Sequence, residues 1–117
     1  MAALLNKQPP TKLEAIDLSK ATYRPEWMTR AFRNNRYVIM INDNAATTHG
    51  PAIRCMVQKI DNTPINFHWR SMQAIKNEIF GREATAIEYY PAHSELIDDK
   101  NIYWMWVFPD GVIPKPV

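Results

Sequence analysis

The sequence predicts a single α+β domain in which a four-stranded, mainly antiparallel sheet carries one helix on one face. Residues 66–81 have apolar side chains at helical spacing, whereas four other stretches have the alternation or the β-branched and aromatic content of strands. We expect an extended N-terminal arm over residues 1–22, the domain over residues 23–111 and an extended C-terminal tail over residues 112–117. After the arm the order is strand, strand, helix, strand, strand, which is typical of the α+β class.

The N-terminal part of the chain is poor in signals for regular structure. Pro9, Pro10 and Pro25 interrupt any long helix. We expect one short helix over Glu26–Phe32, because Pro25 suits the first position of a helix and because Trp27 would share a face with the last residue of this segment.

The four strands and the main helix follow from periodicity. The expected strands are Arg36–Ile41, Ala52–Ile60, Thr85–Tyr90 and Ile102–Phe108, and residues 42–51 form a polar hairpin loop between the first two. In the second strand, Ile53, Cys55 and Val57 share one face, and Arg54 and Gln58 share the other. Asn66 can cap the helix start, and Gly81 can take the left-handed turn after its end. The apolar face of this helix consists of Trp69, Met72, Ile75, Ile79 and Phe80.

The last strand is apolar on both faces. One face carries Ile102, Trp104, Trp106 and Phe108, and the other carries Tyr103, Met105 and Val107. A strand with one wet face should alternate, and one helix can cover only one face. We therefore expect Trp27 and Phe32, which precede the first strand, to pack, together with Met28, on the face opposite the helix. The alternative covers are a second copy of the chain and a foreign partner.

Composition narrows the class of protein. A chain of 117 residues can form one modest core, and 46% apolar residues indicate a folded domain. The net charge of +2 creates no strong field towards nucleic acid or anionic lipid. The first residues do not resemble a secretory signal, the longest apolar run is too short to span a bilayer, and the lone Cys55 favours a reducing compartment. We expect a small, soluble, intracellular domain.

The residues that could carry chemistry do not form a recognisable catalytic or metal-binding pattern. His49, His68 and His93 lack metal-ligand spacing and are expected to be solvated or capping. Cys55 is expected to be a small buried hydrophobe, and its pairing with His68 or His93 has no motif to support it. The three glycines mark turns and form no phosphate loop.

The carboxylates do not match a metal-dependent nuclease, which needs an acid-x-Lys pair beside a second acid on adjacent strands. The acidic and basic candidates, all expected on a solvated face, are Glu78, Glu88, Asp98, Asp99, Lys76 and Lys100. We therefore expect a protein that is no enzyme and that has no metal site and no cofactor.

The best candidate for a binding surface is the segment from Tyr23 to Tyr37, where arginines alternate with aromatic residues. The candidate partner-binding residues are Arg24, Trp27, Arg30, Arg33 and Arg36. Such a segment could contact phosphates and stack on bases, or it could bind an acidic protein surface. A third interpretation makes Trp27 and Phe32 the core lid and leaves the arginines in water. The low net charge and the absence of the aromatic-glycine signature of RNA readers disfavour nucleic acid.

Several motifs carry a resemblance. They are the lead-in of Trp27, Arg30, Phe32, Arg33 and Asn34, the helix from Trp69 to Gly81, the stretch from Ala86 to Pro91 and the end from Asn101 to Pro109. On these motifs, residues 23–111 resemble a family of small, uncharacterised proteins encoded by bacteriophages and prophages. The chain has Tyr103 and Trp104 where the family pattern has a histidine before a Met-Trp pair, so a role for that histidine does not carry over. The resemblance implies a phage origin and work in the host cytoplasm, but no mechanism.

We therefore expect a phage-encoded, non-enzymatic accessory protein, monomeric or homodimeric, that binds and modulates a host protein. Inhibition of a nuclease or defence complex is one such role. The first alternative is a small nucleic-acid-binding module that uses the same arginine and aromatic segment. The second is a virion or assembly component, which extended termini would suit.

Overall fold

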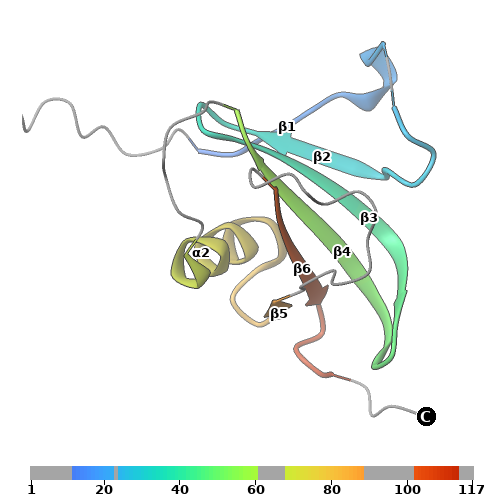
Figure 1. The fold of residues 1–117 in the computed structure, drawn as a ribbon, viewed down its shortest axis with the longest axis vertical. Helices are drawn as coiled ribbons and strands as arrows, with labels where there is room; N and C mark the ends of the chain where they lie inside the picture. Colours follow the sequence, from blue (N-terminus) through green and yellow to red (C-terminus); the bar gives the residue numbers. More distant parts are fainter. Residues whose placement is uncertain (1–11, 23, 61–67, 89–101, 114–117) are drawn as a thin grey trace, which may run out of the picture.

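Six antiparallel strands form one sheet in the part of the chain that the computed structural model describes, and a single α-helix packs on it (Figure 1). That part comprises residues 12–22, 24–60, 68–88 and 102–113. The strands are β1 (Glu14–Ala15), β2 (Arg30–Arg33), β3 (Tyr37–Thr47), β4 (Gly50–Lys59), β5 (Thr85–Glu88) and β6 (Ile102–Phe108), and the helices are the 3-10 helix η1 (Leu18–Lys20) and α2 (Trp69–Phe80). The strand order in the sheet is β1-β2-β3-β4-β6-β5.

The α+β class is confirmed, but the predicted count of four strands is wrong, because β1 and β2 join the sheet at one edge. β2 also replaces the second half of the helix expected over Glu26–Phe32. A seven-residue helix gains few hydrogen bonds for the entropy that it costs. In contrast, Phe32 pairs with Ile39 across a hairpin, and the Asn34 side-chain oxygen accepts the backbone N–H groups of Arg36 and Tyr37 at 2.8 and 2.9 Å. The tertiary pairing therefore decides the local structure.

The hairpin of β3 and β4 is longer than predicted. The polar loop expected over residues 42–51 is almost entirely strand, and only Thr48 and His49 lie between the two strands. Asparagine and aspartate are rare in strands, but a bulge between Asn42 and Ala45 accommodates them. Pairing to β2 ends at Ile41 and pairing to β6 ends at Ile53, so the hairpin continues past both neighbours as a two-stranded ribbon (Figure 1).

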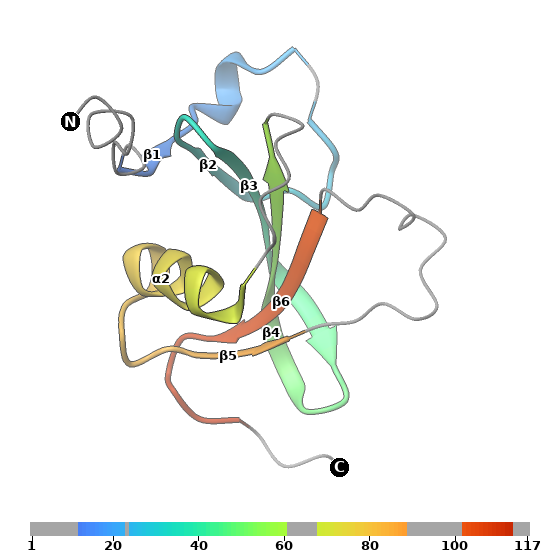
Figure 2. The same ribbon diagram turned by 60° about the vertical axis from the view of Figure 1, so that its left-hand side comes forward.

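The core lies between α2 and the face of the sheet that we call the helix face. Figure 2 shows α2 on one side of the sheet. The largest fully buried side chains of this core are Ile39, Ile41, Cys55, Val57, Met72, Met105 and Val107. The predicted face of the helix is confirmed, because Met72 and Ile75 are buried and Trp69, Ile79 and Phe80 pack against the same core. The predicted division of the second strand is also confirmed, since Cys55 pairs with Met105 and Arg54 with Trp106.

The ends of α2 are only partly as predicted. Asn66, the expected cap, lies outside the described residues, and His68 occupies the N-cap position without a side-chain hydrogen bond. Gly81 follows the last turn with a φ of 90° and a ψ of 162°. A glycine is needed there because of the positive φ, although the conformation is not the left-handed helical one.

The predicted lid of Trp27 and Phe32 is wrong. Phe32 pairs with Ile39 and packs against the core that contains α2, so it lies on the helix face and not on the opposite one. Trp27 is 40% exposed, which is too open for a buried lid residue. On the opposite face, which we call the second face, Trp104 is nevertheless 5% exposed, and the guanidinium carbon of Arg54 lies 3.8 Å from its ring centroid. A cation–π contact within the sheet therefore supplies part of the cover that Trp27 and Phe32 were expected to give.

Candidate protein-binding surface

The five candidate binding residues do not form one patch, because β2 divides them. Arg24, Trp27 and Arg30 lie at or before its first residue, and Arg33 and Arg36 lie at or after its last one. Three steps along a strand span about 10 Å. Arg30 and Arg33 also point to opposite faces, since Arg30 pairs with Ile41 of the helix face and Arg33 pairs with Val38 of the second face. The segment therefore presents two separate groups of residues.

Arg30 is engaged within the domain. Its Nη2 atom lies 2.7 Å from Asp43 Oδ1 and its Nε atom lies 3.0 Å from Oδ2, so the guanidinium grips the carboxylate with two hydrogen bonds. Thr29 Oγ1 also donates to Asp43. The guanidinium carbon lies 5.3 Å from the centroid of the Phe80 ring. Arg30 thus joins β2 to β3 and to the end of α2, which is a structural role.

The Arg30–Asp43 pair predicts a pH-dependent stability. Partial burial of Asp43 works to raise its pKa, but the hydrogen bonds from Arg30 and Thr29 and the charge of Arg30 outweigh it and lower the pKa below the ordinary value of 3.8. A lowered folded-state pKa gives stability that is present above the unfolded pKa and is lost as the pH falls through the folded one. Asp43→Asn should therefore lower the free energy of unfolding by about 1 kcal/mol at neutral pH. Urea unfolding of both proteins should show this gap narrowing as the pH falls below 3.8, and a gap that stays constant as the pH is lowered would contradict the assignment.

A four-residue turn presents Trp27 to solvent. We call residues 25–28 the tryptophan turn. The Met28 N–H donates to the Pro25 carbonyl at 3.0 Å, which closes the turn, and Met28 is 8% exposed, which anchors it. Arg24 lies beside the turn, because its Nε atom donates to the Met28 carbonyl at 2.9 Å. The turn therefore carries an exposed tryptophan and binds an exposed arginine through its backbone.

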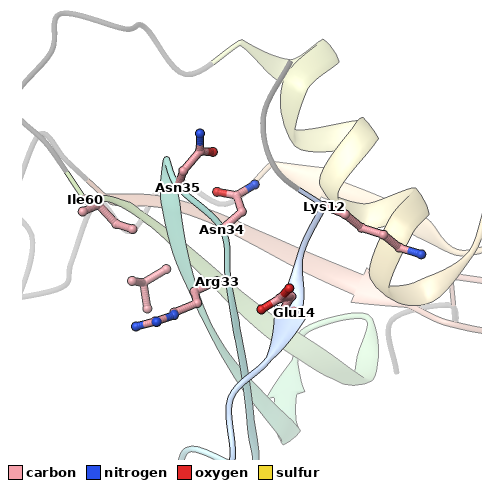
Figure 3. A pocket seen from close by; sticks show the side chains of 7 residues that line it. Lys12, Glu14, Arg33, Asn34, Asn35 and Ile60 are labelled. Atoms are coloured by element: carbon pink, nitrogen blue, oxygen red, sulfur yellow. The ribbon is translucent and has the colours of Figure 1, made fainter. Parts of the chain in front are cut away.

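Arg33 and Arg36 lie near two pockets at the other end of β2. Arg33 is exposed and lines a pocket of about 450 Å³ between β1 and the turn that joins β2 to β3 (Figure 3). Arg36 is half-buried and lines a smaller pocket of about 220 Å³ that also contacts Tyr37 and Glu78. Sequence reasoning named both arginines but missed that they border pockets. The turn signal Asn34-Asn35, flanked by strand-forming residues, could have revealed the hairpin.

Several of the described side chains that could carry out chemistry are buried or hydrogen-bonded within the domain. Cys55 is fully buried as predicted, and loss of solvation raises the pKa of its thiol to about 12, so almost no thiolate exists at neutral pH. Tyr103 donates its hydroxyl to Glu88, and the Leu13 N–H donates to Glu78 at 2.9 Å. The prediction of a solvated Lys76 is wrong: it is 3% exposed, and its ammonium group donates to backbone carbonyls.

The described residues lack a metal-binding cluster and a membrane-spanning helix. Among the described residues, no three His, Cys, Asp or Glu side chains lie close enough together to hold a metal ion. His93, Asp98, Asp99 and Lys100 lie outside those residues. Neither α2 nor η1 has the length and apolar character that spanning a lipid bilayer requires, and the described residues contain no other helix.

The fold and the surface together define a small α+β domain with one helix on an antiparallel sheet and an exposed tryptophan turn. The chain belongs to the family of DUF7694, a domain of unknown function, whose family model matches residues 52–110. The match runs from β4 through α2 to the end of β6, so the tryptophan turn precedes it. No curated protein and no solved structure matches the chain.

Proposed function

We propose that this protein is a non-catalytic binding domain that uses the tryptophan turn and Arg24 to bind another protein. The observation that carries the proposal is the 40% exposure of Trp27 on a turn that is closed by a hydrogen bond and anchored by the buried Met28. The exposed part of the Trp27 side chain is apolar surface that gains free energy when a partner covers it. Tryptophan and arginine are the residues that most often dominate the binding energy of protein interfaces. A fixed turn also loses little entropy when it binds.

The charge around the turn favours a protein partner over nucleic acid. Nucleic-acid binding depends on several cationic side chains that neutralise phosphates together. Near the turn, Arg30 is already neutralised by Asp43, and Glu26 adds a negative charge next to Trp27. Arg24 is then the main available cation at this end of β2, because Arg33 points to the other sheet face. One arginine bound to a turn that exposes one tryptophan fits an interface anchor better than a series of phosphate contacts.

The proposal also covers the origin of the protein and its cellular location. The resemblance to phage and prophage proteins supports a phage-encoded accessory protein that acts in the cytoplasm of a bacterial host. There it would bind and modulate a host protein, and inhibition of a nuclease or defence complex is one such role. Its low net charge and its exposed tryptophan turn are compatible with that role.

The proposal is tested with matched variants of the full chain. Tagged protein is used to capture partners from a bacterial lysate, and captured proteins are identified and then purified for calorimetry. Trp27→Ala and Arg24→Gln should each lower the affinity for the partner by about tenfold or more, since truncation of a hot-spot residue costs more than about 1.4 kcal/mol of binding free energy. Glu26→Gln, on the same turn, is the control and should not weaken it.

Two outcomes would overturn this assignment. Equal affinity of Trp27→Ala and the parent protein would place the interface elsewhere. Capture of nuclease-sensitive nucleic acid, with binding that falls steeply with salt, would replace the protein partner with the nucleic-acid alternative.

A further inference from the structure

The larger of the two pockets at the far end of β2 from the tryptophan turn is polar and contains Arg33. We call it the Arg33 pocket, and its volume is about 450 Å³. It is bordered by β1, by the end of β2 and by the start of β3. The lining residues are Lys12, Glu14, Arg33, Asn34, Asn35, Val38 and Ile60 (Figure 3). Sheet pairing builds this pocket, because Glu14 lies opposite Arg33 and Arg33 lies opposite Val38.

The pocket combines a cation with an apolar surface. Arg33 is exposed, and its guanidinium makes no ion pair or hydrogen bond with another described residue. Ile60 is 53% exposed, and Val38 is half-buried beside it on the second face. A guanidinium over aliphatic side chains can hold a carboxylate with two parallel hydrogen bonds while the stem of the bound side chain covers the apolar part.

The other two charges of the pocket set its preference. Lys12 is exposed and adds a positive charge, although Figure 3 shows its side chain extending away from Arg33 towards α2. Glu14 is directly opposite Arg33 across the β1–β2 pair, a position in which Cβ atoms are about 5 Å apart. This carboxylate repels an incoming acidic group and attracts Arg33. Arg33, which forms no ion pair with a described residue, is therefore the cation that a ligand in the pocket meets, and Glu14 opposes it, so the pocket favours a negatively charged ligand of modest affinity.

We propose that the Arg33 pocket binds an acidic peptide segment in which a glutamate or aspartate is followed by an aliphatic residue. The acidic side chain pairs with Arg33, and the aliphatic one covers Ile60 and Val38. This inference rests on the proposed function and deepens it, because it names the chemistry of a second contact with the partner at the opposite end of β2 from the tryptophan turn. Its test does not need the partner.

The test uses the isotope-labelled full chain and a defined probe, the peptide acetyl-Glu-Leu-Glu-Leu-Glu-amide. Nuclear magnetic resonance titration should shift the amides of residues 12–14, 33–35 and 60, with a dissociation constant in the range of about 1 mM. The uncharged control, acetyl-Gln-Leu-Gln-Leu-Gln-amide, should bind at least about threefold more weakly.

Four variants test which charges determine peptide binding. Arg33→Gln should lower the affinity for the acidic peptide by about tenfold, whereas Glu14→Gln should raise this affinity by about two- to fivefold. Arg70→Gln removes the same charge from an exposed site on α2 and should leave the affinity unchanged. Trp27→Ala should also leave it unchanged, so loss of partner binding in that variant and loss of peptide binding in Arg33→Gln are separate results.

The overturning results are equally specific. Shifts that cluster elsewhere, no shifts up to about 10 mM peptide, or equal effects of Arg33→Gln and Arg70→Gln would each remove the site. A short oligothymidylate that shifts the same amides more strongly than the peptide would replace the acidic peptide with a nucleic acid.

Discussion

Replacing Lys76 with methionine is expected to lower the free energy of unfolding by about 2–3 kcal/mol, since buried carbonyl groups then lose their donor. Lys76 is 3% exposed, and its Nζ atom lies 2.6 Å from the Ala84 carbonyl oxygen. The carbonyl oxygens of Gly81 and Arg82 each lie 3.4 Å from the same nitrogen. Methionine keeps most of the apolar stem, so the loss reports the hydrogen bonds and not a large cavity.

The physical reason is that Lys76 holds the chain between α2 and β5. The last carbonyls of a helix and the loop behind it have no partners within the helix. An ammonium group has three donors and satisfies several of these acceptors at once. It also places a positive charge near the negative end of the helix dipole. The loop over residues 81–84 then delivers β5 to the sheet edge beside β6.

Urea unfolding of the parent protein and two variants measures this effect. Lys20→Met is the control, because its side chain is 83% exposed and its ion pair with Asp17, at 4.0 Å, is on the surface. That variant should change the free energy by less than about 0.5 kcal/mol. Equal losses in the two variants would mean that the total charge, and not the buried contacts of Lys76, determines stability.

The parts of the fold with a strong period could be predicted from the sequence. In α2, the apolar residues recur at helical spacing over three turns, and the helix packs with the predicted face. β4 and β6 have the predicted faces as well, because their alternation is set by local sequence and agrees with the core. Burial of Cys55 follows from the same alternation.

The N-terminal strands could not be predicted because their structure depends on distant partners. Glu14 and Ala15 form a strand only through pairing with Arg33 and Phe32, which no local pattern indicates. Residues 30–33 could form a helical turn or a strand, and β3 selects the strand. The Asn42–Asn44 segment has the composition of a loop and is strand because β4 lies beside it.

The candidate site failed as a single patch for the same reason. A helix over Glu26–Phe32 would have placed its arginines by a period of 3.6, whereas a strand alternates them between faces. Arg30 therefore reaches Asp43 on the helix face, and Arg33 reaches the pocket on the other side. The exposure of Trp27 depends on a turn that composition alone could not separate from a helix start. The sequence identified the arginine and tryptophan residues, but which of them lie together depends on the strand pairing in the sheet.

Gly111→Ala is expected to lower the free energy of unfolding by about 4 kcal/mol, because it combines backbone strain with a collision. Gly111 has a φ of 72°, and an added Cβ would lie 2.4 Å from the Glu83 carbonyl oxygen. This oxygen belongs to backbone and cannot rotate away. Its displacement would also disturb the hydrogen bond from Thr85 Oγ1 to the Gly111 carbonyl at 3.0 Å.

Gly81→Ala separates the two causes. Gly81 has a φ of 90°, but no atom lies within 4 Å of the position of an added Cβ. This variant should therefore show the conformational cost alone, about 2 kcal/mol. Thermal and urea unfolding of both variants should rank Gly111→Ala as the less stable, and an equal loss would show that the Glu83 backbone yields without cost.

Combining Gly111→Ala with Lys76→Met tests whether the two contacts act on one element. Glu83 lies in the loop whose carbonyls Lys76 binds, so both changes loosen the same four residues. Once Lys76 no longer holds this loop, the Glu83 carbonyl can move away from the new methyl group at a lower cost. The double variant should then lose at least about 0.5 kcal/mol less than the sum of the single losses. Strict additivity would mean that Gly111 and Lys76 stabilise the β5 edge independently.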